Sequence, residues 1–326
     1  MNYPYFSLFG ITAFLLFAAR FFNRWRRKAG TRFRKSVWGF SLGLALVLAV
    51  GSGVLGGYVT WLVHRGQPED LQTALFRGID YTRRATRTPR PMVIHVVSID
   101  LKTPGVRFLV TPGDPVDGRA IRAQKTSAFL KKSGAQLAIN GNYFFPFRSN
   151  SPFDYFPHDG DGVDLCGIAA SCGEVYSKRE WVEGTLYISE KNEVSFDEPI
   201  GPVYNAIAGN GFLTRGGVVS PTIPASEPYP RAAIGLTKDR ARLLLFIIDG
   251  KQPGYSEGAT LTELAQVMLE AGAHDGVRLD EGGSCALAAE DGAGGAKLLN
   301  VPVNHRIPFT ERVVANHLGV FAERMR

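Results

Sequence analysis

The sequence has few of the residues that build metal centres and disulfide frameworks. Only three cysteines occur in 326 residues, Cys166, Cys172 and Cys285, and their spacing matches no zinc ribbon or finger. The six histidines are scattered, without an HExxH motif. We therefore expect neither a metal nor another cofactor. Two alternatives remain for the cysteines: Cys166 and Cys172 close a small disulfide loop, or all three are unpaired thiols.

Acidic residues are scarce in the first part of the chain, and this shapes the charge of the whole. Residues 1–90 hold 14 Lys and Arg against three Asp and Glu, a net charge of +11. The remainder holds 23 basic and 27 acidic residues, a net charge of −4. A nucleic-acid-binding protein carries its basic surface on the folded domain. We therefore expect no nucleic-acid partner.

Two stretches near the N-terminus contain no charged side chain. Residues 1–19 are near the lower length limit for a membrane span, whereas residues 37–63 are long enough to predict a transmembrane helix. The eight Lys and Arg of residues 20–35 favour a cytoplasmic position for the segment between them. Everything after His64 is then extracytoplasmic, periplasmic or extracellular, and tethered to the cell membrane by an uncleaved signal anchor. A cleaved signal peptide is the competing interpretation.

The composition predicts three regions. Residues 1–64 form the membrane anchor, and residues 65–90, which end in proline-rich sequence, form a linker with at most one short helix. Residues 91–326 form a soluble domain with many short β-rich runs. Residues 260–271 have apolar side chains at helical spacing and predict one clear helix. Many strands with few helices predict an α+β fold.

One stretch of this domain places acidic residues where chemistry can occur. The apolar run Ile247-Ile248 ends at Asp249-Gly250, and the predicted helix follows. A second apolar step ends at Leu279-Asp280, before Glu281 and the Gly282-Gly283 pair. This order brings two carboxylates and a glycine-rich turn to one edge, where backbone N–H groups can approach an anionic ligand. Ser284 lies outside any Gly-x-Ser-x-Gly elbow, so we do not expect serine-hydrolase chemistry.

Several motifs of residues 91–326, taken in order, resemble the phosphodiester glycosidase family, to which the mannose-phosphate uncovering enzyme belongs. Besides the Asp249-Gly250 step, they are Ala138-Ile139-Asn140-Gly141-Asn142-Tyr143-Phe144, Gly209-Asn210-Gly211, Pro230-Arg231-Ala232-Ala233-Ile234-Gly235, Thr260-Leu261-Thr262-Glu263-Leu264-Ala265 and Arg312-Val313-Val314-Ala315-Asn316-His317-Leu318-Gly319-Val320. The resemblance implies a hydrolase that cleaves a sugar-1-phosphodiester into a free sugar and a phosphomonoester.

This reaction suggests roles for particular residues. It needs a carboxylate that activates water or stabilises an oxocarbenium-like centre, and polar groups that hold the phosphate. Asp280 is the candidate carboxylate, with Asp249 as the alternative. Arg231 is the candidate phosphate ligand, because its planar fork suits two oxygens. The other candidate substrate ligands are Asn140, Gly141, Asn210, Gly282, Gly283 and Ser284.

The sequence departs from the family pattern at Glu281. The family's hallmark reads Asn-Leu-Asp-Gly-Gly-Gly-Ser, and glutamate replaces its first glycine here. If that position needs a positive φ or close substrate approach, Glu281 strains the loop or narrows the pocket; alternatively it adds a catalytic carboxylate. Three hypotheses follow: a phosphodiester glycosidase acting on a surface or extracellular glycan, a non-catalytic glycan-binding or exopolysaccharide-assembly protein, or a metal-dependent phosphodiesterase.

Overall fold

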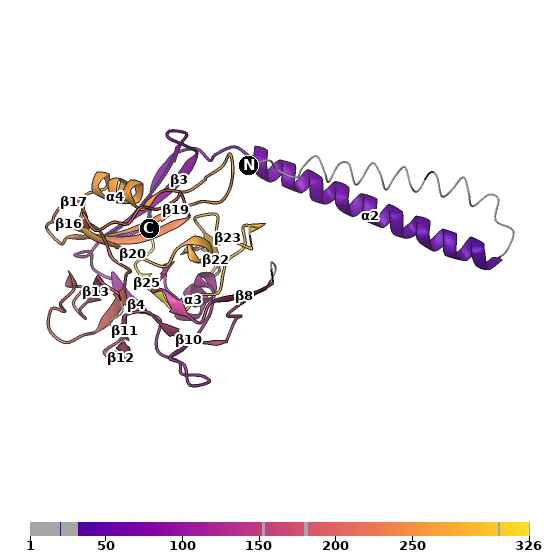
Figure 1. Ribbon diagram of the computed structural model, residues 1–326. Coiled ribbons are helices and arrows are strands. Elements are labelled where there is room, and N and C mark those ends of the chain that lie inside the picture. The colour runs from indigo at the N-terminus through magenta and orange to yellow at the C-terminus, as the bar shows by residue number, and fades with distance from the viewer. Residues whose placement is uncertain (1–19, 21–31, 152–153, 179–181, 306, 326) are drawn as a thin grey trace. The chain divides into compact units, whose positions relative to one another are not determined.

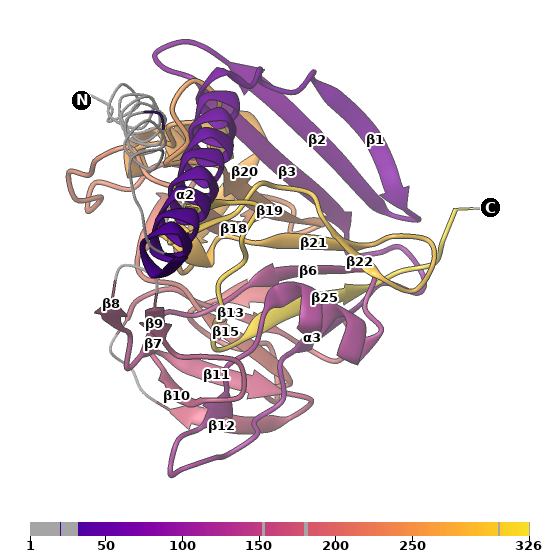
Figure 2. The ribbon, with the colours of Figure 1, turned by 90° about the vertical axis from the view of Figure 1, so that its right-hand side faces the viewer.

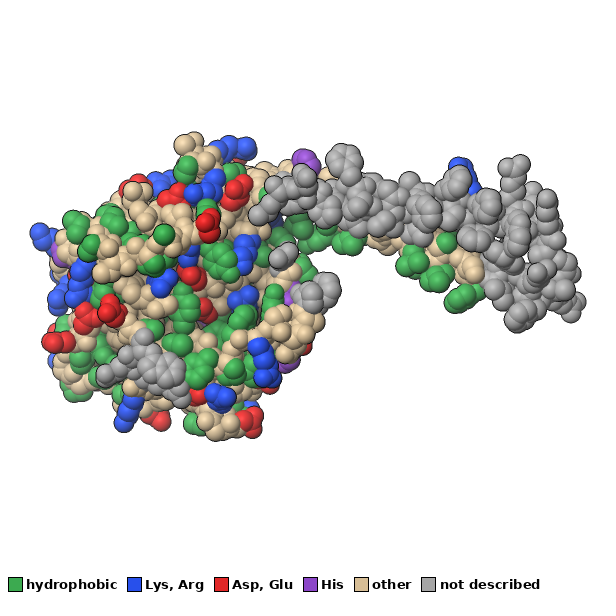
Figure 3. Space-filling view, viewed as in Figure 1, with side chains coloured by type: hydrophobic (Ala, Val, Ile, Leu, Met, Phe, Trp, Pro, Cys, Tyr) green, Lys and Arg blue, Asp and Glu red, His purple; other side chains and the backbone are tan. Residues whose placement is uncertain are grey.

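The structure is a computed structural model that describes residues 20, 32–151, 154–178, 182–305 and 307–325. Contacts divide the chain into residues 1–66 and residues 67–326. In the first part, α2 (Arg32–His64) contains Gly39–Leu62, a stretch with mean hydropathy 2.0 that is long and apolar enough to cross a membrane. Exposed apolar side chains run along this helix (Figure 3). The second possible span, residues 1–19, lies outside the described residues.

The predicted α+β, strand-rich fold is confirmed in residues 67–326, whose largest layer is an eight-stranded antiparallel sheet (Figure 1). Its strand order is β1-β2-β3-β19-β18-β20-β16-β17. In chain order these strands are β1 (Leu71–Phe76), β2 (Ile79–Thr86), β3 (Met92–Asp100), β16 (Phe212–Arg215), β17 (Val218–Val219), β18 (Arg231–Thr237), β19 (Arg242–Ile248) and β20 (Ala273–Arg278).

Two five-stranded sheets form the rest of the framework (Figure 2). One has the order β22-β21-β6-β25-β4 and the other β12-β11-β15-β13-β14. Their strands are β4 (Arg107–Val110), β6 (Leu137–Asn140), β11 (Ile168–Ser171), β12 (Glu174–Lys178), β13 (Thr185–Ile188), β14 (Val194–Phe196), β15 (Asn205–Ala208), β21 (Leu287–Glu290), β22 (Ala296–Leu298) and β25 (His317–Phe321).

Shorter elements complete the domain. They are β5 (Ile121–Arg122), β7 (Phe144–Phe145), β8 (Arg148–Ser151), β9 (Asp154–Phe156), β10 (Gly162–Leu165), β23 (Val303–Asn304), β24 (Ile307–Pro308), the helix α3 (Thr126–Ser133) and the 3₁₀ turn η1 (Gly282–Ser284). The main hydrophobic core takes residues from the eight-stranded sheet and from both five-stranded sheets, so the three sheets share one interior.

The helix predicted at residues 260–271 is α4 (Leu261–Glu270), and it covers the other face of the eight-stranded sheet (Figure 1). Thr260 and Glu263 form a capping box at its start, because each side chain accepts from the other residue's backbone N–H. Glu263 also receives two hydrogen bonds from Arg90, at 2.7 and 2.9 Å. These contacts tie the helix to the segment that enters β3.

The structure differs from the expected linker at residues 65–90. β1 and β2 form a hairpin there, and β2 pairs with β3 along its whole length, from Ile79↔Ile99 to Thr86↔Met92. The compact part therefore begins at Gln67 rather than near residue 91. The hairpin buries Ile79 and Tyr81 on one face and keeps polar side chains on the other.

Candidate active site

The strand ends that carry the candidate carboxylates meet at one edge of the eight-stranded sheet. β19 runs directly into Asp249, and β20 is followed by Leu279 and Asp280. β18 lies between these strands and is antiparallel to both, so Arg231 at its start falls beside their ends. The strand, helix and strand inferred from the sequence therefore bring both carboxylates and the arginine to this edge.

Asp280 is a carboxyl group that the fold removes from water. Only 8% of the residue is exposed. Its Oδ1 accepts a hydrogen bond from the Glu281 N–H at 2.9 Å, and the Ser284 hydroxyl also bonds the carboxylate. Burial raises the pKa of Asp280 to about 7, against the opposing effects of Ser284 and the positive charge of Arg312. A carboxyl group with this pKa exchanges protons at neutral pH, as acid–base catalysis requires.

The turn that follows Asp280 is Glu281-Gly282-Gly283. It needs glycine at its second and third positions and accepts glutamate at its first. Glu281 has a φ of −127°, an extended conformation open to any residue, so it does not strain the turn. The positive φ, +71°, occurs at Gly282, where a Cβ would lie 2.6 Å from Cε1 of Tyr229. A Cβ on Gly283 would lie 2.3 Å from Nη2 of Arg312. Tyr229 and Arg312 therefore pack directly against this turn.

Arg231, the candidate phosphate ligand, is already occupied on every nitrogen. Nε donates to the Ala259 carbonyl at 2.9 Å, Nη2 to the Glu227 carbonyl at 2.7 Å, and Nη1 to the Glu281 carboxylate. The Arg231 side chain is 4% exposed and that of Glu281 is 19% exposed. The glutamate carboxylate thus neutralises the guanidinium. A phosphate that approached Arg231 would therefore meet the negative charge of Glu281.

The candidate asparagine and glycine ligands mainly shape the backbone around Asp280. The Asn140 amide donates to the Asp280 carbonyl at 2.7 Å and accepts from the Ala286 N–H at 3.1 Å. The Gly141 carbonyl accepts from the Asp280 N–H at 3.0 Å. The Asn210 N–H donates to a carbonyl of β20 at 2.9 Å, and its side chain is half-buried beside the strand end. Asn140 and Gly141 therefore position the turn that carries Asp280.

Asp249 is a buried hub rather than an exposed carboxylate. It accepts hydrogen bonds from the Asn300 amide at 3.1 Å and the Val301 N–H at 3.0 Å, and its Oδ2 lies 3.2 Å from His95 Nε2. Its side chain is fully buried. The Tyr255 hydroxyl completes the network at 3.4 Å. These bonds fasten the end of β19 to the segment that follows β22.

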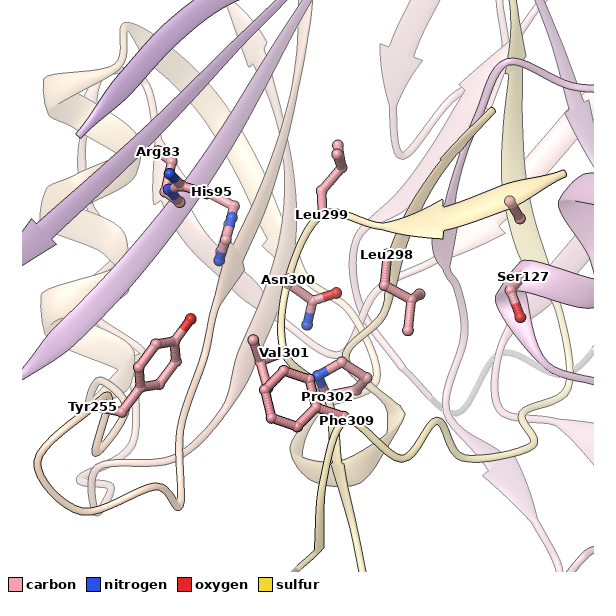
Figure 4. Close-up of a pocket in the computed structure, with 11 residues that line it drawn as sticks. Arg83, His95, Ser127, Tyr255, Leu298, Leu299, Asn300, Val301, Pro302 and Phe309 are labelled. Atoms are coloured by element: carbon pink, nitrogen blue, oxygen red, sulfur yellow. The ribbon is translucent and has the colours of Figure 1, made fainter. Parts of the chain in front are cut away.

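The partners of Asp249 line a cavity of about 410 Å³, shown in Figure 4. Its lining residues are Arg83, His95, Ser127, Tyr255, Ala296, Leu298, Leu299, Asn300, Val301, Pro302 and Phe309. Asp280 is not among them. Figure 4 shows His95, Tyr255 and Asn300 facing the cavity, so Asp249 lies behind its wall and orients the residues that form it.

Sequence reasoning did not assign four side chains that the structure places at the turn. Arg312 and Tyr229 pack on the glycines, and Lys251 lies on the Tyr229 ring with Nζ 3.9 Å from its centroid. The Tyr143 hydroxyl is buried without a hydrogen-bond partner among the described residues. Burial raises its pKa above the usual range, and the charges of Glu281 and Asp280 add to this. Arg312 and Tyr143 were detectable, because each stands within one of the family-like motifs.

The cysteines supply no second reactive group at this site. Cys172 is an unpaired thiol, so the Cys166–Cys172 loop is not closed by a disulfide. Cys285 directly follows the 3₁₀ turn, and burial raises the pKa of its thiol well above the usual value, with further contributions from the carboxylates of Glu281 and Asp280. A thiol that stays protonated is a poor nucleophile.

Comparison with known proteins gives one family and a set of similar structures. A model of the phosphodiester glycosidase family matches residues 133–321. No curated protein sequence matches the chain. A hypothetical protein from Synechocystis has a similar structure, with a TM-score of 0.60 and 15% identity. The match covers 78% of this chain and 64% of that protein, so the chain spans less than two thirds of it.

A second similar structure is the zebrafish N-acetylglucosamine-1-phosphodiester alpha-N-acetylglucosaminidase catalytic domain, auto-inhibited by its pro-peptide. The TM-score is 0.54 at 20% identity, and the match covers 80% of this chain and 86% of that one. At 15% and 20% identity, the similarity to these two structures establishes the fold alone. The motif-based resemblance is confirmed by the family match.

Proposed function

Because this chain belongs to the phosphodiester glycosidase family, a family of glycosidase-type hydrolases, we propose that it is a membrane-anchored extracytoplasmic enzyme that cleaves sugar-1-phosphodiesters in a surface or extracellular glycan. The observation that carries the proposal is Asp280, a buried carboxyl group with a pKa of about 7 beside the positive charge of Arg312. This combination suits a proton transfer next to an anionic substrate.

The proposed reaction uses Asp280 as a general base. Its ionised form accepts a proton from water as the water oxygen bonds to the anomeric carbon of the sugar. The bond between that carbon and the phosphate oxygen breaks, and its electron pair leaves with the phosphomonoester. Phosphate is a good leaving group, so the reaction needs less general-acid help than an ordinary glycoside requires. Nearby cations stabilise the charge on the departing phosphate.

The membrane anchor is proposed from α2 and its flank. Gly39–Leu62 has 24 residues, and a helix of this length extends about 36 Å, enough to cross a hydrocarbon core of about 30 Å. The basic residues that precede it favour a cytoplasmic N-terminal side. The catalytic domain then lies on the extracytoplasmic side, close to envelope glycans.

The Glu281–Arg231 pair favours one alternative, a non-catalytic glycan-binding or assembly protein, because it neutralises a cation that a phosphate needs. Hydrolysis tests the choice. We would incubate the full-length chain, in detergent micelles, with a panel of sugar-1-phosphodiesters, and quantify free sugar and phosphomonoester. Asp280→Asn should abolish release, while Asp197→Asn should not, because Asp197 pairs with Arg215 on the exposed surface.

Other results would redirect the assignment. Glycan binding by a folded protein that releases no sugar would favour the binding role. Release of a sugar phosphate instead of free sugar, abolished by a chelator, would indicate a metal-dependent phosphodiesterase. Turnover that survives Asp280→Asn would remove Asp280 from the mechanism.

A further inference from the structure

Arg231 is poorly suited to bind the phosphate of the substrate. Each of its three guanidinium nitrogens already donates to an acceptor, and one of these acceptors is the negatively charged Glu281 carboxylate. Two backbone N–H groups of the turn are engaged as well. The Gly282 N–H donates to the Pro230 carbonyl at 2.9 Å, and the Ser284 N–H lies 3.4 Å from the Glu281 carbonyl. Cations that lack a neutralising partner are therefore the better candidates for binding an anion at this turn.

Arg312 is a cation fixed in place without a neutralising partner. Its guanidinium carbon lies 4.7 Å from the Phe147 ring centroid and 5.5 Å from that of Tyr155. Nε donates to the amide oxygen of Asn304 at 3.2 Å, a neutral acceptor. No ion pair joins Arg312 to a carboxylate within the described ranges. Aromatic contacts hold the guanidinium while both Nη groups keep donors for a ligand.

The position of Arg312 also suits an anion at the catalytic carboxyl group. Nη2 is the atom that a Cβ on Gly283 would meet at 2.3 Å, so the guanidinium lies directly on the turn. Its charge reaches Asp280, whose pKa it lowers against the effect of burial. A phosphate bound by Arg312 would therefore lie near the proposed base.

Lys251 is a second such cation, on the ring that packs against the neighbouring glycine. Its Nζ donates to the Tyr229 hydroxyl at 2.7 Å and lies 3.9 Å from the ring centroid. The same ring limits Gly282 to a residue without a side chain. Lys251 is exposed and, in the described part of the chain, pairs with no carboxylate. An ammonium group held this way keeps two donors for an anion.

We propose that Arg312, assisted by Lys251, binds the phosphate of the substrate at the Gly282–Gly283 turn, and that Arg231 instead holds Glu281 as part of the framework. This assignment rests on the proposed function for the identity of the substrate. The ligand class is an anionic phosphate oxygen, in a diester before cleavage and in a phosphomonoester after it. Arg312 supplies the planar fork and Lys251 a point charge.

Measuring the binding of two simple phosphate probes tests this site without requiring that the protein hydrolyse a substrate. We would titrate full-length protein in detergent with inorganic phosphate and with dimethyl phosphate, by calorimetry, in the wild type and in Arg312→Gln, Arg312→Lys and Lys251→Gln. Arg107→Gln is the control, because the guanidinium carbon of Arg107 also lies over an aromatic ring, 5.0 Å from the Phe321 centroid, but on an exposed side chain away from the turn. Near-ultraviolet circular dichroism and melting curves would show that each variant is folded.

The expected result is at least about tenfold weaker binding of both probes in Arg312→Gln, and about threefold weaker binding in Lys251→Gln. Arg312→Lys should bind with intermediate affinity, because it retains charge but loses the fork. Arg107→Gln should bind as the wild type does. Equal affinity in Arg312→Gln and the wild type overturns the proposal, as does a wild type that binds neither probe at about 10 mM.

The outcomes for binding and for hydrolysis are distinguishable. Arg312-dependent phosphate binding without hydrolysis of any sugar-1-phosphodiester would support this site and refute the proposed enzyme activity. Hydrolysis with an unchanged KM in both Arg312→Gln and Lys251→Gln would support the enzyme and refute this site.

Discussion

Glu281→Gln is the substitution that most directly tests how charge is arranged at this turn. Glu281 pairs with Arg231 in a largely buried setting, with side chains 19% and 4% exposed. Glutamine keeps a carbonyl oxygen that Arg231 can still bond, so the guanidinium is not left without an acceptor. What changes is one negative charge beside the proposed phosphate position. The variant therefore isolates repulsion from loss of structure.

The size of the effect follows from the electrostatics of a partly buried pair. Two unit charges roughly 6 Å apart repel by about 3 kcal/mol at an effective dielectric constant of about 20. Partial exposure of Glu281 reduces this by screening, to about 1–2 kcal/mol. We therefore expect Glu281→Gln to bind inorganic phosphate about 5- to 30-fold more tightly. The KM for a phosphodiester should fall similarly, with a smaller change in kcat.

Phosphate titration by calorimetry and inhibition by phosphate measure this gain independently. Glu323→Gln is the control, since Glu323 forms an equivalent pair with Arg77 at 2.7 Å on the exposed surface. It should leave phosphate affinity unchanged. Affinity in Glu281→Gln within twofold of the wild type, or weaker, would refute the reasoning. A large loss of kcat would show instead that Glu281 is itself a catalytic carboxylate.

Three further changes test the site and its support. In the wild type, kcat/KM should rise with pH through about 7, and Asp280→Asn should abolish this activity. The substitution should also remove a contribution to the free energy of unfolding that is present below about pH 4 and lost as pH rises through 7, because the folded carboxyl group holds its proton more tightly. Burial lowers the pKa of His317 to about 3, so its contribution, about 3 kcal/mol between pH 7 and pH 4, is lost as pH falls; His317→Gln should remove that slope in urea melts. Asp249→Ala should cost about 3–5 kcal/mol of unfolding free energy, because it leaves His95 and Asn300 without their buried acceptor; an unchanged urea midpoint would contradict this.

The sequence predicted those parts of the fold whose signal is local. α4 was visible from its apolar spacing, and its capping residues Thr260 and Glu263 stand where the helix begins. The β1–β2 hairpin was not predicted, because charged residues within β2, such as Asp80, Arg83 and Arg84, give the segment the composition of a linker. In β2 the buried Ile79 and Tyr81 alternate with polar residues, as expected for a strand with one buried face, but the pairing of β2 with β3 depends on tertiary contacts.

The grouping of the candidate site residues was predictable from the sequence, whereas their roles stay a prediction. Motif order placed Asp280, Glu281 and Arg231 together, and the structure brings them to one edge. The Glu281–Arg231 pair was not predicted, because fifty positions separate the partners along the chain. Nor does sequence distinguish an aspartate that faces substrate from one like Asp249, whose carboxylate holds a neighbouring loop.

The hairpin at the start of the domain also limits the distance between the folded domain and the proposed membrane anchor. Between the end of α2 at His64 and the start of β1 at Leu71 only residues 65–70 remain. Fully extended, six residues span about 20 Å, whereas a linker of 26 residues would span about 90 Å. In the anchored arrangement proposed above, the start of β1 can lie at most about 20 Å from the end of α2. Under that proposal, we expect substrates whose sugar-phosphate bonds lie close to the membrane to be cleaved faster than polymer far from it.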